Sequence, residues 1–383
     1  MAAMLKRLLS VSAVALLTFT TFAISAQVRS DHPSSYVVQR GDTLWGIAGK
    51  FLQKPWLWPE IWQANPQIEN PHLIYPGDVI SLAYLQGRPS IQPGPRTEAL
   101  IDAIPLSEVE SFLRRLQVVE DFRSMPYVVG LEEDRLRSAG GQVAYVRGLE
   151  GARAGDRFTV VRPMQRYALA ERRNGSRQGR SVDLTFRGDP DLQRSWWVDG
   201  SRGDGEFLGY ELMELAIGQV TRTATDGHEV ATLLLTGEGR EVREGDRLMP
   251  VNPKPFDLQF FPHPPRGLPT EPGRAQVLAV ADGLHGAGPR YVVVLSVGAR
   301  DGIDNGTVVS LWHPGESKPD RVSSRNPFTQ RANSVQLPDE FNGHAMVFRT
   351  FDRVSYALVM ESIRPTRVGD QAKHPDATRF DTL

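Results

Sequence analysis

The chain has 383 residues, of which 40% are hydrophobic and 23% are charged, and its formal net charge is −1. This composition is ordinary for a globular protein of two or three domains. The near-zero charge provides no whole-chain electrostatic basis for binding nucleic acid or an anionic membrane. The 35 glycines and 28 prolines favour many turns and short strands over long helices.

Residues 1–26 have the three-part pattern of a secretory signal peptide. Lys6 and Arg7 precede an apolar run over 8–24, and small residues end the segment at Ala26. The alternative is a retained membrane anchor, because about 17 apolar residues nearly span a bilayer. We expect cleavage, which removes two positive charges from the net charge of −1 and leaves a periplasmic protein of net charge −3 without a transmembrane segment. The chain contains no cysteine, so its domains must be stabilised by their cores without disulfides.

Residues 36–83 are predicted to form a β-α-α-β unit. The β-prone run "YVVQ" leads into a turn at Gly41. Asp42 or Thr43 can cap the helix that follows, because a short side-chain oxygen satisfies the free amides of the first turn. The apolar stripe of this helix consists of Leu44, Ile47, Ala48 and Phe51.

A second short helix is expected within "KPWLWPEIWQANP", followed by a strand over 78–82. Four of the seven tryptophans of the chain lie in this β-α-α-β unit. Tryptophans in so small a unit either fill the core or form an exposed surface on which the apolar faces of sugars can rest. We expect Trp45, Trp58 and Trp62 in the core, and Trp56, which lies off their stripe, to be exposed.

A linker is expected over 84–99, because its proline- and glycine-rich sequence favours an extended chain. An amphipathic helix is expected over 107–119. It begins with a capping box formed by Ser107 and Glu110 at the S-x-x-E spacing. Its apolar face consists of Val109, Phe112, Leu113 and Leu116.

From about residue 125 onward, strands are expected to dominate, and one sequence unit recurs. Each copy is a strand, a short connection and a glycine turn that opens the next strand, where the glycine supplies positive φ. The turns lie at Gly155-Asp156, Gly245-Asp246, Gly306 and Gly369-Asp370. Four copies predict a mostly-β C-terminal region of small repeated β-barrel or sandwich units.

The β region divides into a first β-rich domain over 100–250 and a second over 274–375. The proline-rich connection at 251–273 separates them. Two polar insertions, 165–206 and 313–338, are long for loops in a compact domain. The arginines of the first insertion can bind an acidic partner surface; the alternative is a solvated, disordered loop.

The sequence offers no catalytic template. It has no HExxH, no GxSxG and no P-loop, and its eight histidines have no pair at a metal-ligand spacing. The glycine-rich "GLHGAG" at 283–288 is expected to turn a hairpin. We therefore expect neither an enzyme nor a bound metal or cofactor.

Four spaced motifs carry a resemblance to a known family. They are V-x-x-G-D-T-L-W at 38–45, I-A at 47–48, N-P at 65–66 and I-Y-P-G-D-x-I at 74–80. Together they resemble a LysM domain. The resemblance implies an α+β domain of βααβ fold that binds N-acetylglucosamine-containing glycans, chiefly bacterial peptidoglycan.

The same resemblance implies a shallow groove between the first strand–helix loop and the second helix–strand loop. Its expected contacts are Gly41, Asp42, Thr43 and Leu44 on one side, and Asn65, Pro66, Ile68, Leu73, Ile74 and Tyr75 on the other. The segment "LQKPWLWPEIW" is longer and richer in tryptophan than is typical of the family. This departure leaves open whether the groove is unaltered.

The order of parts is similar to that of the TsaP family, the LysM proteins associated with type IV pilus secretins. That family has a LysM domain followed by a region like the C-terminal part of the flagellar protein FlgT. The resemblance implies a periplasmic protein that aligns the outer-membrane secretin with the cell wall. The alternatives are a general envelope protein, a LysM-targeted peptidoglycan hydrolase and a protein of the flagellar base.

Overall fold

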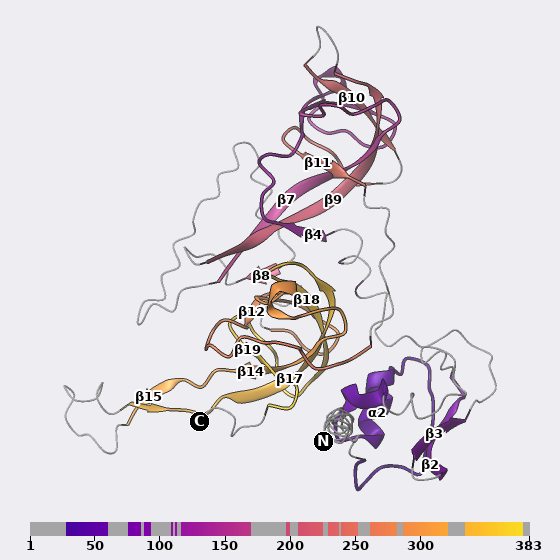
Figure 1. The fold of residues 1–383 in the computed structure, drawn as a ribbon, viewed down its shortest axis with the longest axis vertical. Coiled ribbons are helices and arrows are strands. Elements are labelled where there is room, and N and C mark those ends of the chain that lie inside the picture. Colours follow the sequence, from indigo (N-terminus) through magenta and orange to yellow (C-terminus); the bar gives the residue numbers. More distant parts are fainter. Residues whose placement is uncertain are drawn as a thin grey trace, which may run out of the picture.

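The described part of the chain falls into three groups of elements (Figure 1). The computed structural model describes residues 28–59, 76–85, 88–92, 109, 112, 116–169, 197–199, 206–224, 229–236, 239–251, 261–281, 286–320 and 334–377. We call 28–92 the N-terminal domain, 116–251 without strand β8 (Trp197–Asp199) the first β unit, and 261–377 the second β unit. The expected signal peptide lies outside the described residues. In the parts that the structure describes, no helix has the length and apolarity needed to cross a membrane.

The N-terminal domain combines a three-stranded sheet with one α-helix. Its elements are β1 (Ser35–Val37), α2 (Leu44–Phe51), the 3-10 turn η1 (Pro55–Leu57), β2 (Val79–Leu85) and β3 (Arg88–Gln92). The sheet has the order β1-β2-β3, with antiparallel neighbours. The first helix therefore forms where the sequence predicts it. Of the second predicted helix, the structure describes η1 and the helical residues Trp58 and Pro59.

Two predictions in the connecting region are corrected. The expected linker contains the strand β3, which pairs with β2. Pro89 is compatible with this strand because β3 lies at the edge of the sheet, where a missing amide breaks no ladder. The predicted helix at 107–119 is helical at Val109 and Phe112, but β4 begins at Leu116. The β-branched residues at the end of that segment favour a strand.

The strands of the first β unit form a ring of hydrogen-bonded pairs. They are β4 (Leu116–Val119), β5 (Tyr127–Leu131), β6 (Val143–Arg147), β7 (Arg157–Leu169), β9 (Glu206–Arg222), β10 (Ala231–Thr236) and β11 (Arg247–Pro250), with the 3-10 turn η2 (Glu132–Asp134) after β5. The sheet order is β10-β6-β5-β11-β7-β9-β4, and β10 also pairs with β9. This extra pairing closes the ring, and β4 extends it at β9.

The second β unit repeats this arrangement. Its strands are β12 (Val277–Ala281), β13 (Val292–Leu295), β14 (Val308–His313), β15 (Ser317–Pro319), β16 (Ser334–Gln336), β17 (Glu340–Thr350), β18 (Ser355–Ser362) and β19 (Gln371–Lys373), with the 3-10 turn η4 (Ala299–Asp301) after β13. The sheet order is β19-β14-β17-β18-β13-β12-β8, and a bridge between Gln276 and Gln371 joins its two sides. Leaving out β4, β8, β15 and β16, both rings have the same strand order when their strands are counted along the chain.

The same turn precedes the second, third and sixth strand of each ring. In the first unit, the amides of Gly141, Gly155 and Gly245 donate to carbonyls of the neighbouring strand, each at 2.8 Å. In the second unit, Arg290, Gly306 and Gly369 make the equivalent bonds at 2.8, 2.7 and 2.8 Å. All six residues have positive φ. These recurring turns therefore hydrogen-bond neighbouring strands to each other.

The turns before the sixth strands carry a buried aspartate in each unit. Asp246 accepts two hydrogen bonds from Arg162, at 2.7 and 2.9 Å. Asp370 accepts from Asn342 at 2.7 Å and lies 2.8 Å from His313 Nδ1. Burial raises the pKa of both carboxyl groups, although Arg162 opposes the shift in Asp246, and the Arg367 amide and His313 oppose it in Asp370. The same backbone position is therefore stabilised by different partners in the two units.

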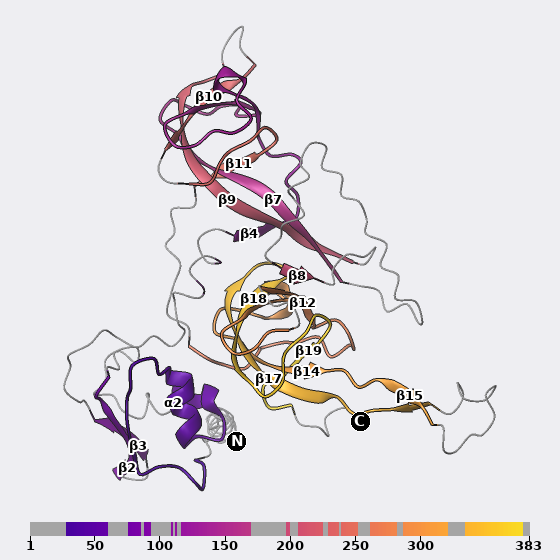
Figure 2. The same ribbon diagram turned by 180° about the vertical axis from the view of Figure 1, so that it is seen from behind.

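Parts of both insertions form strands. The first begins within β7, and its residues Trp197–Asp199 form β8, which pairs with β12 of the second unit. The second insertion contains the β15–β16 pair, which projects from the second unit (Figures 1 and 2). Most of the arginine-rich segment lies outside the described residues. Strand β8 shows that the first insertion connects the two units.

A buried carboxylate lies at the contact between the two β units. The hydroxyl of Tyr167 donates to Glu211 Oε2 at 2.5 Å within the first unit. The hydroxyl of Tyr356 donates to the same oxygen at 2.7 Å from the second unit. Burial raises the pKa of both tyrosines well above the ordinary value, so their hydroxyls remain donors. Nearby, the buried Arg349 donates to the carbonyl of Phe112 at 2.8 Å.

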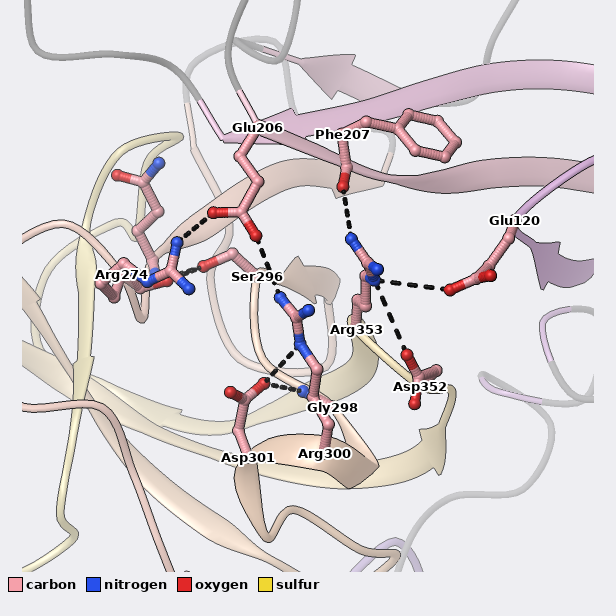
Figure 3. Close-up of polar contacts among 11 residues, drawn as sticks. Glu120, Glu206, Phe207, Arg274, Ser296, Gly298, Arg300, Asp301, Asp352 and Arg353 are labelled. Atoms are coloured by element: carbon pink, nitrogen blue, oxygen red, sulfur yellow. Dashed lines mark hydrogen bonds and ion pairs between the residues drawn. The ribbon is translucent and has the colours of Figure 1, made fainter.

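Ion pairs also join the two β units (Figure 3). Glu206 at the start of β9 binds Arg274 and also Arg300, the latter at 3.3 Å. Arg353 donates to the carbonyl of Phe207 at 3.1 Å and lies 3.5 Å from Glu120. The hydrogen bond from Arg274, with a smaller contribution from Arg300, holds the pKa of Glu206 below its ordinary value despite partial burial. The two β units are thus joined by a buried polar centre and by ion pairs.

Replacing the turn glycine Gly369 tests the backbone constraint. Gly369→Ala places a side chain on a backbone with φ of +90°, although no atom lies within 4 Å of the new Cβ. We expect a loss of about 1 kcal/mol in the free energy of unfolding, measured in urea. Gly288→Ala is the matched control, because its Cβ also meets nothing within 4 Å and its φ lies outside the strained range. Equal stability of the two variants would contradict the assignment.

The variant Tyr356→Phe tests the contact between the units. It removes a donor to the buried Glu211 carboxylate, so we expect a loss of about 1.5–3 kcal/mol in the free energy of unfolding. Thermal melting followed by circular dichroism measures the loss. The exposed Tyr145 provides the control, since Tyr145→Phe is expected to leave stability unchanged. A Tyr356→Phe variant as stable as this control would show that the hydroxyl does not stabilise the contact.

Candidate functional site

The loop between β1 and α2 contains a turn like those of the β units. In this turn, a glycine with positive φ is followed by an aspartate whose carboxylate accepts the amide three residues before it. Gly41 has a φ of +89°, which glycine adopts without strain. The Asp42 carboxylate accepts from the amide of Gln39 at 2.8 Å and from the hydroxyl of Tyr36 at 2.9 Å. These bonds fix the loop before any ligand arrives, and they leave the Gly41 backbone exposed.

Thr43 is the residue that caps α2. Its Oγ1 accepts from the amide of Gly46 at 3.1 Å, and its carbonyl accepts from the amide of Ile47 at 2.9 Å. Leu44 is only 6% exposed and packs into the core. Gly41, Asp42 and Thr43 therefore retain accessible surface in this loop, whereas the side chain of Leu44 has little left for a ligand.

A second glycine turn ties the end of β1 to the start of β2. The amide of Gly77, which has a φ of +95°, donates to the carbonyl of Val38 at 2.8 Å. The amide of Val38 donates back to the carbonyl of Asp78 at 2.9 Å. The two loops expected to border the groove thus meet at Val38. The expected contacts on the other side, Asn65, Pro66, Ile68, Leu73, Ile74 and Tyr75, lie outside the described residues.

Comparison with known proteins identifies this unit. Residues 36–83 match the family model described as LysM domain. These residues form a LysM domain. A LysM domain is a binding module for peptidoglycan and related carbohydrates. Among the described residues there is no group of side chains able to hold a metal ion.

One curated relative resembles this chain over a short stretch. It is the uncharacterized protein YqbP of Bacillus subtilis (strain 168), which is 37% identical over 60 residues. The match covers 13% of this chain and 27% of that protein. The match therefore indicates a relationship for a small part of the chain and assigns no activity to the whole protein.

The three tryptophans of the LysM domain that the structure describes are buried, which confirms the expectation for two of them and corrects it for the third. Trp45 and Trp58 are 3% and 5% exposed, as expected for core residues. Trp56, predicted to be exposed, is also only 5% exposed. Trp62 lies outside the described residues. Trp56 is covered because it packs against the second β unit, where its ring centroid lies 4.5 Å from that of His344.

His344 is the centre of the contact between the LysM domain and the second β unit. Its Nδ1 lies 2.6 Å from Glu361 Oε1, and its Nε2 lies 3.1 Å from the carbonyl of Pro375. Both ring nitrogens therefore lie next to hydrogen-bond acceptors. A salt bridge of 2.8 Å between Lys54 and Asp376 borders the contact.

Sequence reasoning missed this contact because its two sides lie about three hundred residues apart in the chain. The one available signal was the tryptophan-rich segment, whose length and composition depart from a typical LysM domain. Its Trp56 is explained by a protein surface rather than by a sugar.

The variant Glu361→Gln tests the His344 contact through pH. Burial raises the pKa of Glu361, but the hydrogen bond and the charge of His344 lower it more, so the folded-state pKa lies below the ordinary 4.5. A lowered pKa means that this carboxylate stabilises the fold above pH 4.5 and that the stabilisation is lost as pH falls through the folded-state value. We expect the difference in melting temperature between wild type and variant to shrink as pH falls below 4.5. A difference independent of pH would contradict this role.

Proposed function

We propose that this protein binds peptidoglycan through its LysM domain and aligns an outer-membrane secretin of type IV pili with the cell wall. The observation that supports the glycan half is the Gly41-Asp42 turn. Its carboxylate already holds two internal donors, so the exposed backbone at Gly41 is preorganised. Preorganisation lowers the entropy that a loop loses on binding.

The proposed site comprises Gly41, Asp42, Thr43 and Leu44 with Asn65, Pro66, Ile68, Leu73, Ile74 and Tyr75. Leu44 would take part through its backbone, because its side chain is buried. A shallow groove of this kind binds one glycan weakly. A ring of copies around an oligomeric pore would increase the avidity by roughly 10²–10⁴ through effective concentration.

The proposed location is the periplasm, after removal of residues 1–26. We propose that 100–250 and 274–375 are duplicated small β-barrels. The identical strand order of the two rings and their shared turns support this proposal. Strand β4 ends the first sheet and β8 ends the second. We propose that another strand-rich protein docks on these terminal strands by strand addition.

Glycan binding is tested with the mature chain and purified peptidoglycan sacculi in a sedimentation assay. Asp42→Ala removes the acceptor that fixes the loop, so we expect at least about a tenfold loss of binding, equal to roughly 1.4 kcal/mol. Asp156→Ala is the matched control, because Asp156 accepts the equivalent amide bond from Arg153 in the first β unit. Retention of full binding by Asp42→Ala would contradict the proposed site.

The secretin is tested separately with the same mature chain as bait in a detergent extract of outer membranes. Recovery of a secretin, identified by mass spectrometry, would support the alignment role. Binding of sacculi without recovery of a secretin would leave a general peptidoglycan-binding envelope protein. Release of soluble fragments from the sacculi would instead favour the hydrolase.

A further inference from the structure

In each β unit, the third and fourth strands continue beyond the ring as a two-stranded ribbon. In the first unit, β7 pairs with β11 as far as Val161 but with β9 as far as Leu169. In the second unit, β14 pairs with β17, and the β15–β16 pair prolongs this ribbon. The amide of Leu337 joins the two parts by donating to the carbonyl of Glu316 at 3.0 Å. The two units therefore share a ribbon as well as a strand order.

The ribbon of the first unit covers the first two strands of the second ring. Tyr167 and Leu208 of this ribbon belong to the same buried cluster as Leu278 of β12 and Val294 of β13. Beside the ribbon, β8 pairs with β12 at Ala279–Ala281. Every residue of β12 and β13 is buried. A ribbon from one unit and a strand pair from the other thus already form a contact within this chain.

Strands β5 and β6 of the first ring correspond to β12 and β13. Val128 of β5 matches Val277 of β12, because each exchanges two backbone hydrogen bonds with the turn before the sixth strand. In both strands, the pairing register shifts directly after this valine. The match therefore extends to the next residue, which is Val129 in β5 and Leu278 in β12.

The face formed by β5 and β6 is exposed where its counterpart is covered. Tyr145 corresponds to Val294, because each pairs with the second residue after the matched valine. Val129 and Tyr145 are each 37% exposed, whereas Leu278 and Val294 are 2% and 0% exposed. On its other side, β5 pairs with β11 at Tyr127, and no described strand pairs with β5 beyond that point, where β8 joins β12 in the second ring. The first ring thus presents an acceptor surface like the one that the second ring has filled.

The β15–β16 part of the second ribbon projects from its own unit (Figures 1 and 2). Every residue of β15 and β16 is exposed. Two apolar side chains are among the exposed residues here, Val335 at 52% and Leu337 at 37%. An isolated two-stranded hairpin is at best marginally stable in water. An exposed ribbon that carries apolar side chains therefore suits a surface against which it can pack.

The charges of the two surfaces are opposite. Within β15 and β16, Lys318 is the charged residue. The turn η2, directly after β5, consists of Glu132, Glu133 and Asp134. Of these three, Glu133 is already paired with Arg135 at 2.6 Å. Opposite charges favour the encounter of two surfaces and help to fix their orientation.

We propose that the β15–β16 ribbon of one copy of this chain packs on the β5–β6 face of a second copy. The occupant is a second copy because the chain uses the equivalent contact internally, between the β7–β9 ribbon and the β12–β13 face. Each copy then offers one ribbon and one face, so the contact joins copies head to tail. Such a contact either closes into a ring or continues as a filament. This inference goes beyond glycan and secretin binding and depends on neither.

Two variants of the mature chain test the inference, one on each surface. Val335→Asp alters the ribbon and Tyr145→Asp alters the face, because each places a charge in an apolar contact. Both side chains are exposed, and melting followed by circular dichroism checks that the fold is kept. The serine variants at the same positions replace any aspartate variant that melts early. Val37→Asp is the matched control, because Val37 is 52% exposed in the LysM domain, away from both surfaces.

Sedimentation velocity over a range of protein concentrations measures the association. We expect the wild type and Val37→Asp to associate reversibly into species larger than a pair of chains. Each of the two test variants should weaken this association at least about tenfold. An equimolar mixture of them should recover an association that stops at pairs, because Val335→Asp keeps its face and Tyr145→Asp keeps its ribbon.

The inference is overturned by a wild type that remains monomeric at every concentration. It is also overturned if the two variants, shown to be folded, associate as the wild type does. A mixture of folded variants that does not pair would mean that the ribbon of one copy does not meet the face of another. That result would overturn the inference even if each variant alone is monomeric.

Discussion

Each β unit depends on one backbone constraint, a turn in which a single residue takes positive φ. The amide of that residue donates to a carbonyl of the neighbouring strand, and the carbonyl of the next residue accepts the amide of the same partner residue, as Gly155 and Asp156 do with Val220. Three such turns per unit join strands that are distant in the chain. Without them, the sheets would present long unpaired edges, which are prone to association. The constraint is strict enough that glycine fills five of its six positions.

The parts of the fold that sequence predicts are those decided by neighbouring residues. Helix α2 follows from its apolar stripe and its Thr43 cap, both of which act within one or two turns. The glycine turns follow from the conformational freedom of glycine. The strand order of the rings does not follow, because pairing partners such as Tyr127 and Arg247 are 120 positions apart and no local pattern specifies them.

The candidate site also has one part that neighbouring residues determine and one part that depends on distant residues. Gly41, Asp42 and Thr43 are local features of a turn and a helix cap, and their arrangement agrees with the motif. The burial of Trp56 depends on how the LysM domain meets the second β unit. Residue spacing within the LysM domain predicts that a tryptophan off the core stripe is exposed. The spacing carries no information about the second β unit, which covers Trp56.

The LysM domain precedes the first β unit in the chain yet packs on the second. Tension applied to a LysM domain held by a glycan would therefore enter the second β unit through Trp56, His344 and the Lys54–Asp376 pair. The covalent route through the first β unit would bear load only after this contact yielded. Strand β8, which crosses from the first unit to β12, provides a further connection between the two units. The order of parts in space thus makes the second β unit the first to bear the load.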